Sequence, residues 1–131
     1  MSASTDACRA LVLQMGGTID DNLTALAGGA QNSAPRLKSE GNRFTKVVTA
    51  ADSCQLPALK SLEAGGMARV VINDTAAALA VFPATGETIN ALAANASLSV
   101  PAGQSAIFVP GAQPTIGPTA ILTNWRAAVI P

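Results

Sequence analysis

The sequence predicts an all-β fold, an antiparallel β-sandwich or small barrel with an extended N-terminal arm. Short runs rich in β-branched and aromatic residues recur between residues 69 and 109, and such runs favour strands. Residues that set turn geometry close each run, as Asn-Asp does at 73–74 and Pro-Ala-Thr-Gly at 83–86. With 131 residues, the chain is long enough for one domain with one core.

The first third of the chain predicts an arm, one strand and a polar loop. Residues 1–8 are small and polar and predict a mobile arm, whereas residues 9–15 are apolar enough for a strand. Asp20-Asp21-Asn22 is predicted to cap a short helical turn, and residues 31–43 to form a polar loop or linker. We therefore place a soft boundary near Asn42. It divides the chain into an N-terminal arm, strand and loop over 1–43 and an antiparallel β domain over 44–131.

The second part predicts an antiparallel meander of short strands. The predicted hairpin consists of strands over 67–73 and 78–82, and further strands are expected over 44–49, 97–100, 105–109 and 125–130. Residues 88–96 fit either a helix or extended chain. The segment 110–118 must be irregular, because its three prolines donate no ladder hydrogen bond.

Charge and aromatic content point to protein partners. Eight basic and eight acidic residues give zero formal net charge, so no overall field attracts nucleic acid or an anionic membrane. The prolines and polar residues also leave no apolar run long enough to span a membrane. Three Phe and one Trp are the only aromatics. A domain with so few large side chains gains stability by associating with copies of itself, and we expect a homo-oligomer.

The usual catalytic and metal-binding patterns are missing from the sequence. The chain contains no His, which removes Ser-His-Asp and Cys-His mechanisms and makes a zinc site improbable. Neither a phosphate-binding loop of the Walker type nor a Gly-x-Gly-x-x-Gly motif occurs. We therefore expect a protein that is not an enzyme, with no catalytic, cofactor-binding or metal-binding residues.

One stretch resembles a catalytic motif. Residues 70–76, Val-Val-Ile-Asn-Asp-Thr-Ala, resemble the apolar strand and Asp-Thr-Gly of retroviral-type aspartic proteases, in which two chains each supply one carboxylate. Here Ala76 replaces the glycine, and Asn73-Asp74 is also a preferred turn dipeptide. The turn is the preferred interpretation of Asp74.

The two cysteines, Cys8 and Cys54, have no metal-ligand spacing. We expect ordinary buried or surface thiols. The alternative is a disulfide, within the chain or between subunits, in an oxidising exterior. The N-terminus lacks the basic flank and apolar stretch of a secretory signal, which predicts synthesis in the cytoplasm.

From about residue 45 to the end, the order of elements resembles a β domain of small virion proteins of tailed bacteriophages. The matching features include Val-Val-Thr-Ala-Ala-Asp at 47–52, Ala-Leu-Ala-Val-Phe-Pro-Ala-Thr-Gly at 78–86, Ala-Gly-Gln-Ser-Ala-Ile-Phe at 102–108, and Trp125. The resemblance covers about two-thirds of the chain. It implies a role as a capsid decoration (cement) protein, a head fibre or a tail-associated binding protein.

As a decoration protein, the chain would bind the major capsid protein on the capsid surface of the virion and reinforce the shell, as a homotrimer made in the host cytoplasm. The alternative is a trimeric head or tail fibre or a host-surface module that binds carbohydrate, in which Trp125 would stack on sugars. The candidate interface residues are Leu11, Leu13, Met15, Phe108 and Trp125.

Overall fold

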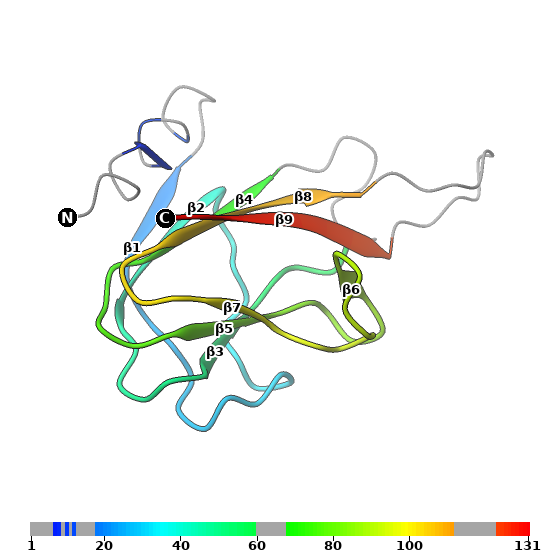
Figure 1. Cartoon of the computed structure of the whole chain (residues 1–131), viewed down its shortest axis with the longest axis horizontal. Helices are drawn as coiled ribbons and strands as arrows, with labels where there is room; N and C mark the ends of the chain where they lie inside the picture. Colours follow the sequence, from blue (N-terminus) through cyan, green and yellow to red (C-terminus); the bar gives the residue numbers. More distant parts are fainter. Residues whose placement is uncertain (1–6, 9, 11, 13–17, 60–67, 112–122) are drawn as a thin grey trace.

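The computed structural model describes residues 7, 8, 10, 12, 18–59, 68–111 and 123–131. Its nine described strands form two sheets that pack as layers of a sandwich (Figure 1). The all-β, sandwich-like class predicted from the sequence is therefore confirmed. The described part also contains helical backbone at four residues near the N-terminus: Ala7, Cys8, Ala10 and Val12.

The larger layer, sheet A, has six strands in the order β1-β2-β4-β8-β9-β6. Their bounds are β1 Ile19–Thr24, β2 Gly41–Lys46, β4 Arg69–Asn73, β6 Thr88–Ile89, β8 Ser105–Pro110 and β9 Asn124–Ile130. The smaller layer, sheet B, has the order β3-β5-β7. Its strands are β3 Asp52–Gln55, β5 Leu79–Phe82 and β7 Leu98–Val100.

The chain alternates between the two sheets from β2 to β8. Parallel neighbours need a connection that returns the chain to the same end of the sheet, and a strand in the opposite sheet provides it here. Thus β3 connects β2 to its parallel neighbour β4, and β4 connects β3 to its parallel neighbour β5. The predicted hairpin of 67–73 with 78–82 is wrong, because β4 and β5 lie in different sheets.

Strand directions are mixed, so the antiparallel part of the prediction holds for only some pairs. The pairs β4 with β8, β5 with β7, and β8 with β9 are antiparallel. The pairs β1 with β2, β2 with β4, β3 with β5, and β6 with β9 are parallel. The closing strand predicted at 125–130 corresponds to β9 and forms a long antiparallel pair with β8.

The predicted linker over 31–43 is folded onto sheet B. Leu37 and Ala34 are buried, and the Leu37 amide donates to the Gln55 carbonyl at 2.9 Å. Isolated bridges join Leu26 to Ser53 and Arg36 to Gln55, so this segment runs beside β3. The boundary placed near Asn42 falls inside β2, and β1 belongs to the same sheet as β2 and β4.

Two local predictions near the N-terminus are wrong. The strand over 9–15 is contradicted at Ala10 and Val12, which are helical. Cys8 and Val12 are four positions apart, so in a helix both reach the same surface. The helical turn predicted at Asp20 is wrong, because residues 19–24 form β1. Ile19 and Leu23 are four positions apart, yet they pack on opposite sides of sheet A. A register irregularity accompanies Asn22, whose φ is 55°.

Residues 1–6 and most of the segment 110–118, which was predicted to be irregular, lie outside the described residues. Pro110 is the last residue of β8.

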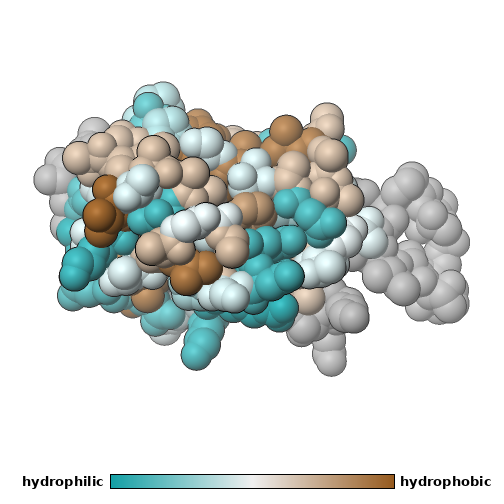
Figure 2. Space-filling model, turned by 90° about the horizontal axis from the view of Figure 1, so that it is seen from below, coloured by the Kyte–Doolittle hydropathy of each residue, from teal (hydrophilic) through white to brown (hydrophobic). Residues whose placement is uncertain are grey.

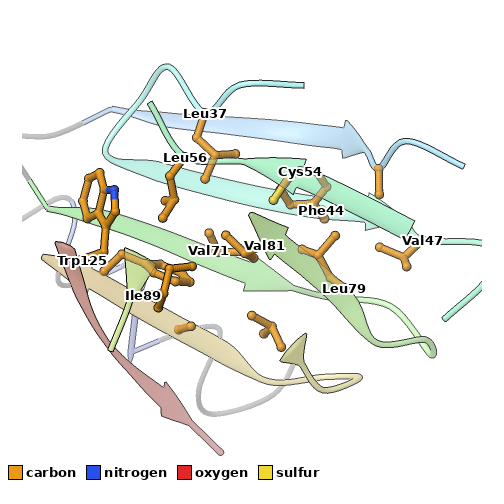
Figure 3. Packing of buried hydrophobic residues seen from close by; sticks show 14 of the residues in the cluster. Leu37, Phe44, Val47, Cys54, Leu56, Val71, Leu79, Val81, Ile89 and Trp125 are labelled. Carbon is orange, nitrogen blue, oxygen red and sulfur yellow. The ribbon is translucent and has the colours of Figure 1, made fainter. Parts of the chain in front are cut away.

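The inner core lies between the two sheets and takes side chains from both (Figure 3). Its largest members are Trp125, Phe44 and Phe108, each with no exposed surface. Trp125 lies at one end of the labelled core residues and Val47 at the other (Figure 3). Because hydrophobic burial is the main favourable term in folding, these side chains hold the two layers together.

A second group of apolar residues, the outer cluster, lies on the opposite face of sheet A. Its buried members are Cys8, Val12, Val70 and Ile72, with Ile19, Ile107 and Ile130 packed against them. Alternate residues of a strand face opposite sides. In β4, Val71 therefore enters the inner core while its neighbours Val70 and Ile72 face outward. Sheet A is apolar on both faces.

The opposite side of the molecule has a different surface. In Figure 1, sheet B and the segment between β1 and β2 lie at the bottom. Seen from there, hydrophilic and hydrophobic residues are interspersed in small areas (Figure 2). An apolar binding surface is therefore expected on the outer face of sheet A.

Candidate binding surface

The carboxylate of the protease-like motif is held in an ion-pair cluster. Arg43 lies on β2, between β1 and β4, and its guanidinium reaches a carboxylate on each side. Its Nη1 donates to Asp21 Oδ1 and its Nη2 to Asp74 Oδ2, both at 2.7 Å. The hydrogen bond that Arg43 donates to Asp21, followed by the one that it donates to Asp74, raises the pKa of Arg43 above its usual value. The cluster fastens β1, β2 and the end of β4 together.

Replacing Asp74 with Asn should lower the free energy of unfolding and should not change any peptide cleavage measured with the purified protein. The Asp74 side chain is 23% exposed and that of Arg43 is 16% exposed, so solvent screens part of their attraction. We expect a loss of about 1 kcal/mol in the free energy of unfolding, measured by urea denaturation. A peptide-cleaving activity that disappears in Asp74→Asn would establish the protease interpretation instead.

Both cysteines are free and buried. Cys54 belongs to the inner core, whereas Cys8 lies in the outer cluster. The candidate disulfide within the chain is therefore not formed in this structure. Burial raises the pKa of the Cys54 thiol. It also raises the pKa of the Cys8 thiol, against a smaller opposite effect of the neighbouring Ser105 side chain.

Thiol labelling should be slow in the native protein. A thiol attacks a labelling reagent as the thiolate, and both buried groups have raised pKa values. We expect little reaction of Cys8 and Cys54 at pH 8, and rapid reaction of both in denaturant. Fast labelling of the native protein, or a covalent dimer on a non-reducing gel, would contradict the burial described here.

Two of the five predicted interface residues lie among the described residues, and both are in the interior. Phe108 and Trp125 are fully buried in the inner core of the single chain, which accounts for their apolar character without a partner. Leu11, Leu13 and Met15 lie outside the described residues. The buried ring of Trp125 offers no face for a sugar in this structure.

The described surface contains instead an open, shallow groove on the outer face of β8 and β9. The groove has a volume of about 390 Å³. We call it the outer groove, and its lining residues are Asn90, Ile107, Val109, Arg126, Ala127 and Ala128. Val109 is 41% exposed. The groove adjoins the outer cluster, since Ile107 contributes to both.

The register of β8 and β9 explains why these residues meet. Ile107 lies opposite Ala128, and Val109 lies opposite Arg126. Residues opposite each other in an antiparallel pair point to the same face. The sequence signal was the unbroken apolar run Ala106-Ile107-Phe108-Val109, because a strand that is apolar at successive positions has two apolar faces.

Two of the basic residues in the first half of the chain are engaged by neighbouring side chains. Arg43 is bound to its two carboxylates, and Arg36 Nε donates to Gln55 Oε1 at 3.1 Å. The described residues also include no group of three or more His, Cys, Asp or Glu side chains placed to hold a metal ion. Within the same residues, no helix is long and apolar enough to cross a membrane.

Comparison of the chain with protein-family models, with curated proteins and with solved structures found no match.

Proposed function

We propose that this chain is a structural protein of a tailed-phage virion that decorates the capsid. In this role it binds the major capsid protein at the outer surface of the shell and reinforces it as a homo-oligomer, with a homotrimer as the expected form. The proposal combines the resemblance of residues 45–131 to small virion β domains with one structural observation. That observation is the apolar outer face of sheet A, which includes the outer groove.

A capsid contact would use a fraction of the surface of the chain. A stable protein contact covers roughly 800 Å² on each partner, which is about one eighth of the 6604 Å² surface of the chain. The outer groove would be one part of such a contact, because Val70 and Ile72 on the same face are already buried. Many copies, each adding a contact of ordinary size, would raise the force needed to open the shell without any catalytic group.

The alternative role, a fibre or host-surface module that binds carbohydrate, has less support. Sugar sites commonly use exposed aromatic rings, and three of the four aromatic side chains of this chain are fully buried: Phe44, Phe108 and Trp125. The fourth, Phe82, is half-buried in sheet B. The burial of these rings thus favours a role in packing within the domain over a role in sugar binding.

The proposal is tested by quantitative mass spectrometry of purified virions of the phage that would encode this chain. We expect hundreds of copies per particle, in a fixed ratio to the major capsid protein. A handful of copies would place the chain at the neck or tail, and its absence from the particle would overturn the proposal.

A further inference from the structure

The outer groove combines an apolar floor with one cation. Ile107, Val109 and Ala128 provide aliphatic surface, and Arg126 lies opposite Val109 in the ladder. Arg126 is exposed. In the described part of the chain its side chain makes neither a hydrogen bond nor an ion pair, unlike that of Arg43, which binds two carboxylates. A cation beside exposed aliphatic surface favours an occupant that offers an apolar side chain and a carboxylate.

The edge of β9 restricts how an occupant can approach. The short strand β6 pairs only with Asn124 and Trp125. Beyond it, the Asn90 side chain accepts from the Ala127 amide at 2.8 Å and donates to the Ala127 carbonyl at 3.1 Å. These two bonds occupy the outward backbone groups of Ala127, so an added strand cannot pair with β9 at this residue, beside the groove. An occupant of the groove therefore lies against the face of β8 and β9 at this point.

Within the described ranges, which exclude Asp6 and Glu63, a second copy of the chain offers few carboxylates for Arg126. Of the acidic residues in the described ranges, five are already engaged or buried: Asp21 and Asp74 bind Arg43, Glu40 accepts from Thr18, and Asp52 and Glu87 are buried. Only Asp20 remains, and it is half-buried. Charge complementarity thus favours a carboxylate from a different protein.

Building on the proposed function, we propose that the outer groove is the contact with the capsid shell. It receives a surface segment of the major capsid protein that carries an aliphatic side chain next to an Asp or Glu. The aliphatic group packs on Ile107, Val109 and Ala128, and the carboxylate forms an ion pair with Arg126. The face already covered by Cys8 and Val12 borders this contact.

A binding assay with particles that lack the chain tests this contact. Capsids assembled without the chain are mixed with purified wild type, Arg126→Glu or Val109→Asp, and the bound fraction is measured by co-sedimentation. Reversing the charge at Arg126 replaces attraction by repulsion, and Val109→Asp places a carboxylate on the apolar floor. We expect each variant to bind at least about tenfold more weakly than wild type.

Two matched variants serve as controls. Val48→Asp introduces the same change at a residue that is 78% exposed and does not line the groove. Lys46→Glu reverses a charge at the exposed last residue of β2. Both should bind like wild type, and thermal unfolding should show that all four variants are folded.

The outcomes separate the two proposals. If wild type does not bind the capsids, the proposed function fails. If wild type binds and both groove variants bind equally well, the groove assignment is wrong while the proposed function stands. If the groove variants bind capsids normally but change the oligomeric state in sedimentation velocity, the groove joins copies of this chain, and the assignment to the capsid protein is overturned.

Discussion

Replacing Trp125 with Ala should reduce the free energy of unfolding by about 3–5 kcal/mol. The indole is fully buried in the inner core, at the end of the sandwich where β9 pairs with β6. Removing it leaves a large cavity between the layers. Since domains of this size have a total stability of roughly 5–15 kcal/mol, the variant should be marginally folded at 25 °C. Urea denaturation followed by circular dichroism measures the loss.

The matched control is Trp125→Phe. Among the described residues the Trp125 Nε1 has no hydrogen-bond partner, so Phe removes volume without leaving a described polar group unsatisfied. We expect a smaller loss, about 1–2 kcal/mol. If Trp125→Ala kept full stability but lost its oligomeric state, Trp125 would be an interface anchor, in contradiction to its place in the core.

Replacing Asn73 with Leu should cost about 2–4 kcal/mol, because Asn73 joins the two sheets through hydrogen bonds. Its side chain has no exposed surface. The amide nitrogen donates to the carbonyls of Ala77 at 2.8 Å, Val100 at 3.0 Å and Pro101 at 3.2 Å. Leu leaves these oxygens without that donor in a buried site. Thermal and urea unfolding should both show the loss.

Thr75→Val is the control for this network. The Thr75 hydroxyl donates to Asn73 Oδ1 at 2.7 Å and accepts from the Ala77 amide at 3.3 Å, so its removal breaks these two bonds and leaves the donors of Asn73 in place. We expect a loss of about 1 kcal/mol. Equal stability of Asn73→Leu and wild type would show that the crossing from β4 to β5 does not depend on this amide.

The positions of many strands could be predicted from the sequence, but their partners could not. Turn residues and β-branched runs are local signals, and they located the strands that became β4, β5, β8 and β9. Whether a five-residue connection makes a hairpin or crosses to the other sheet depends on distant contacts. At residues 74–78 the choice is fixed by Asn73, which bonds to the carbonyls of Val100 and Pro101 on the far side of the core.

The polar segment before β2 was misjudged for the same reason. Its composition is that of a loop, yet Leu37 and Ala34 are buried because the segment lies along β3. Alternation in β1 was also obscured by the irregularity at Asn22, which shifts Leu23 to the inner face. Local pattern gives the strand content of such a domain, whereas pairing requires the three-dimensional contacts.

The candidate surface was only partly accessible from sequence. The scarcity of aromatic residues suggested that Phe108 and Trp125 anchor an interface, but a domain with so few large side chains needs them in its own core. The outer groove depends instead on non-aromatic residues, Val109, Arg126 and Ala128, which the register of β8 and β9 brings together. Neither strand alone shows a site.

The most direct measurement is a density map of the purified virion that resolves the chain on its shell. We predict repeated density at the capsid surface with the outer face of β8 and β9 against the major capsid protein and an acidic residue of that protein beside Arg126. Density only at the neck or tail, or a shell contact made by sheet B instead, would contradict the account.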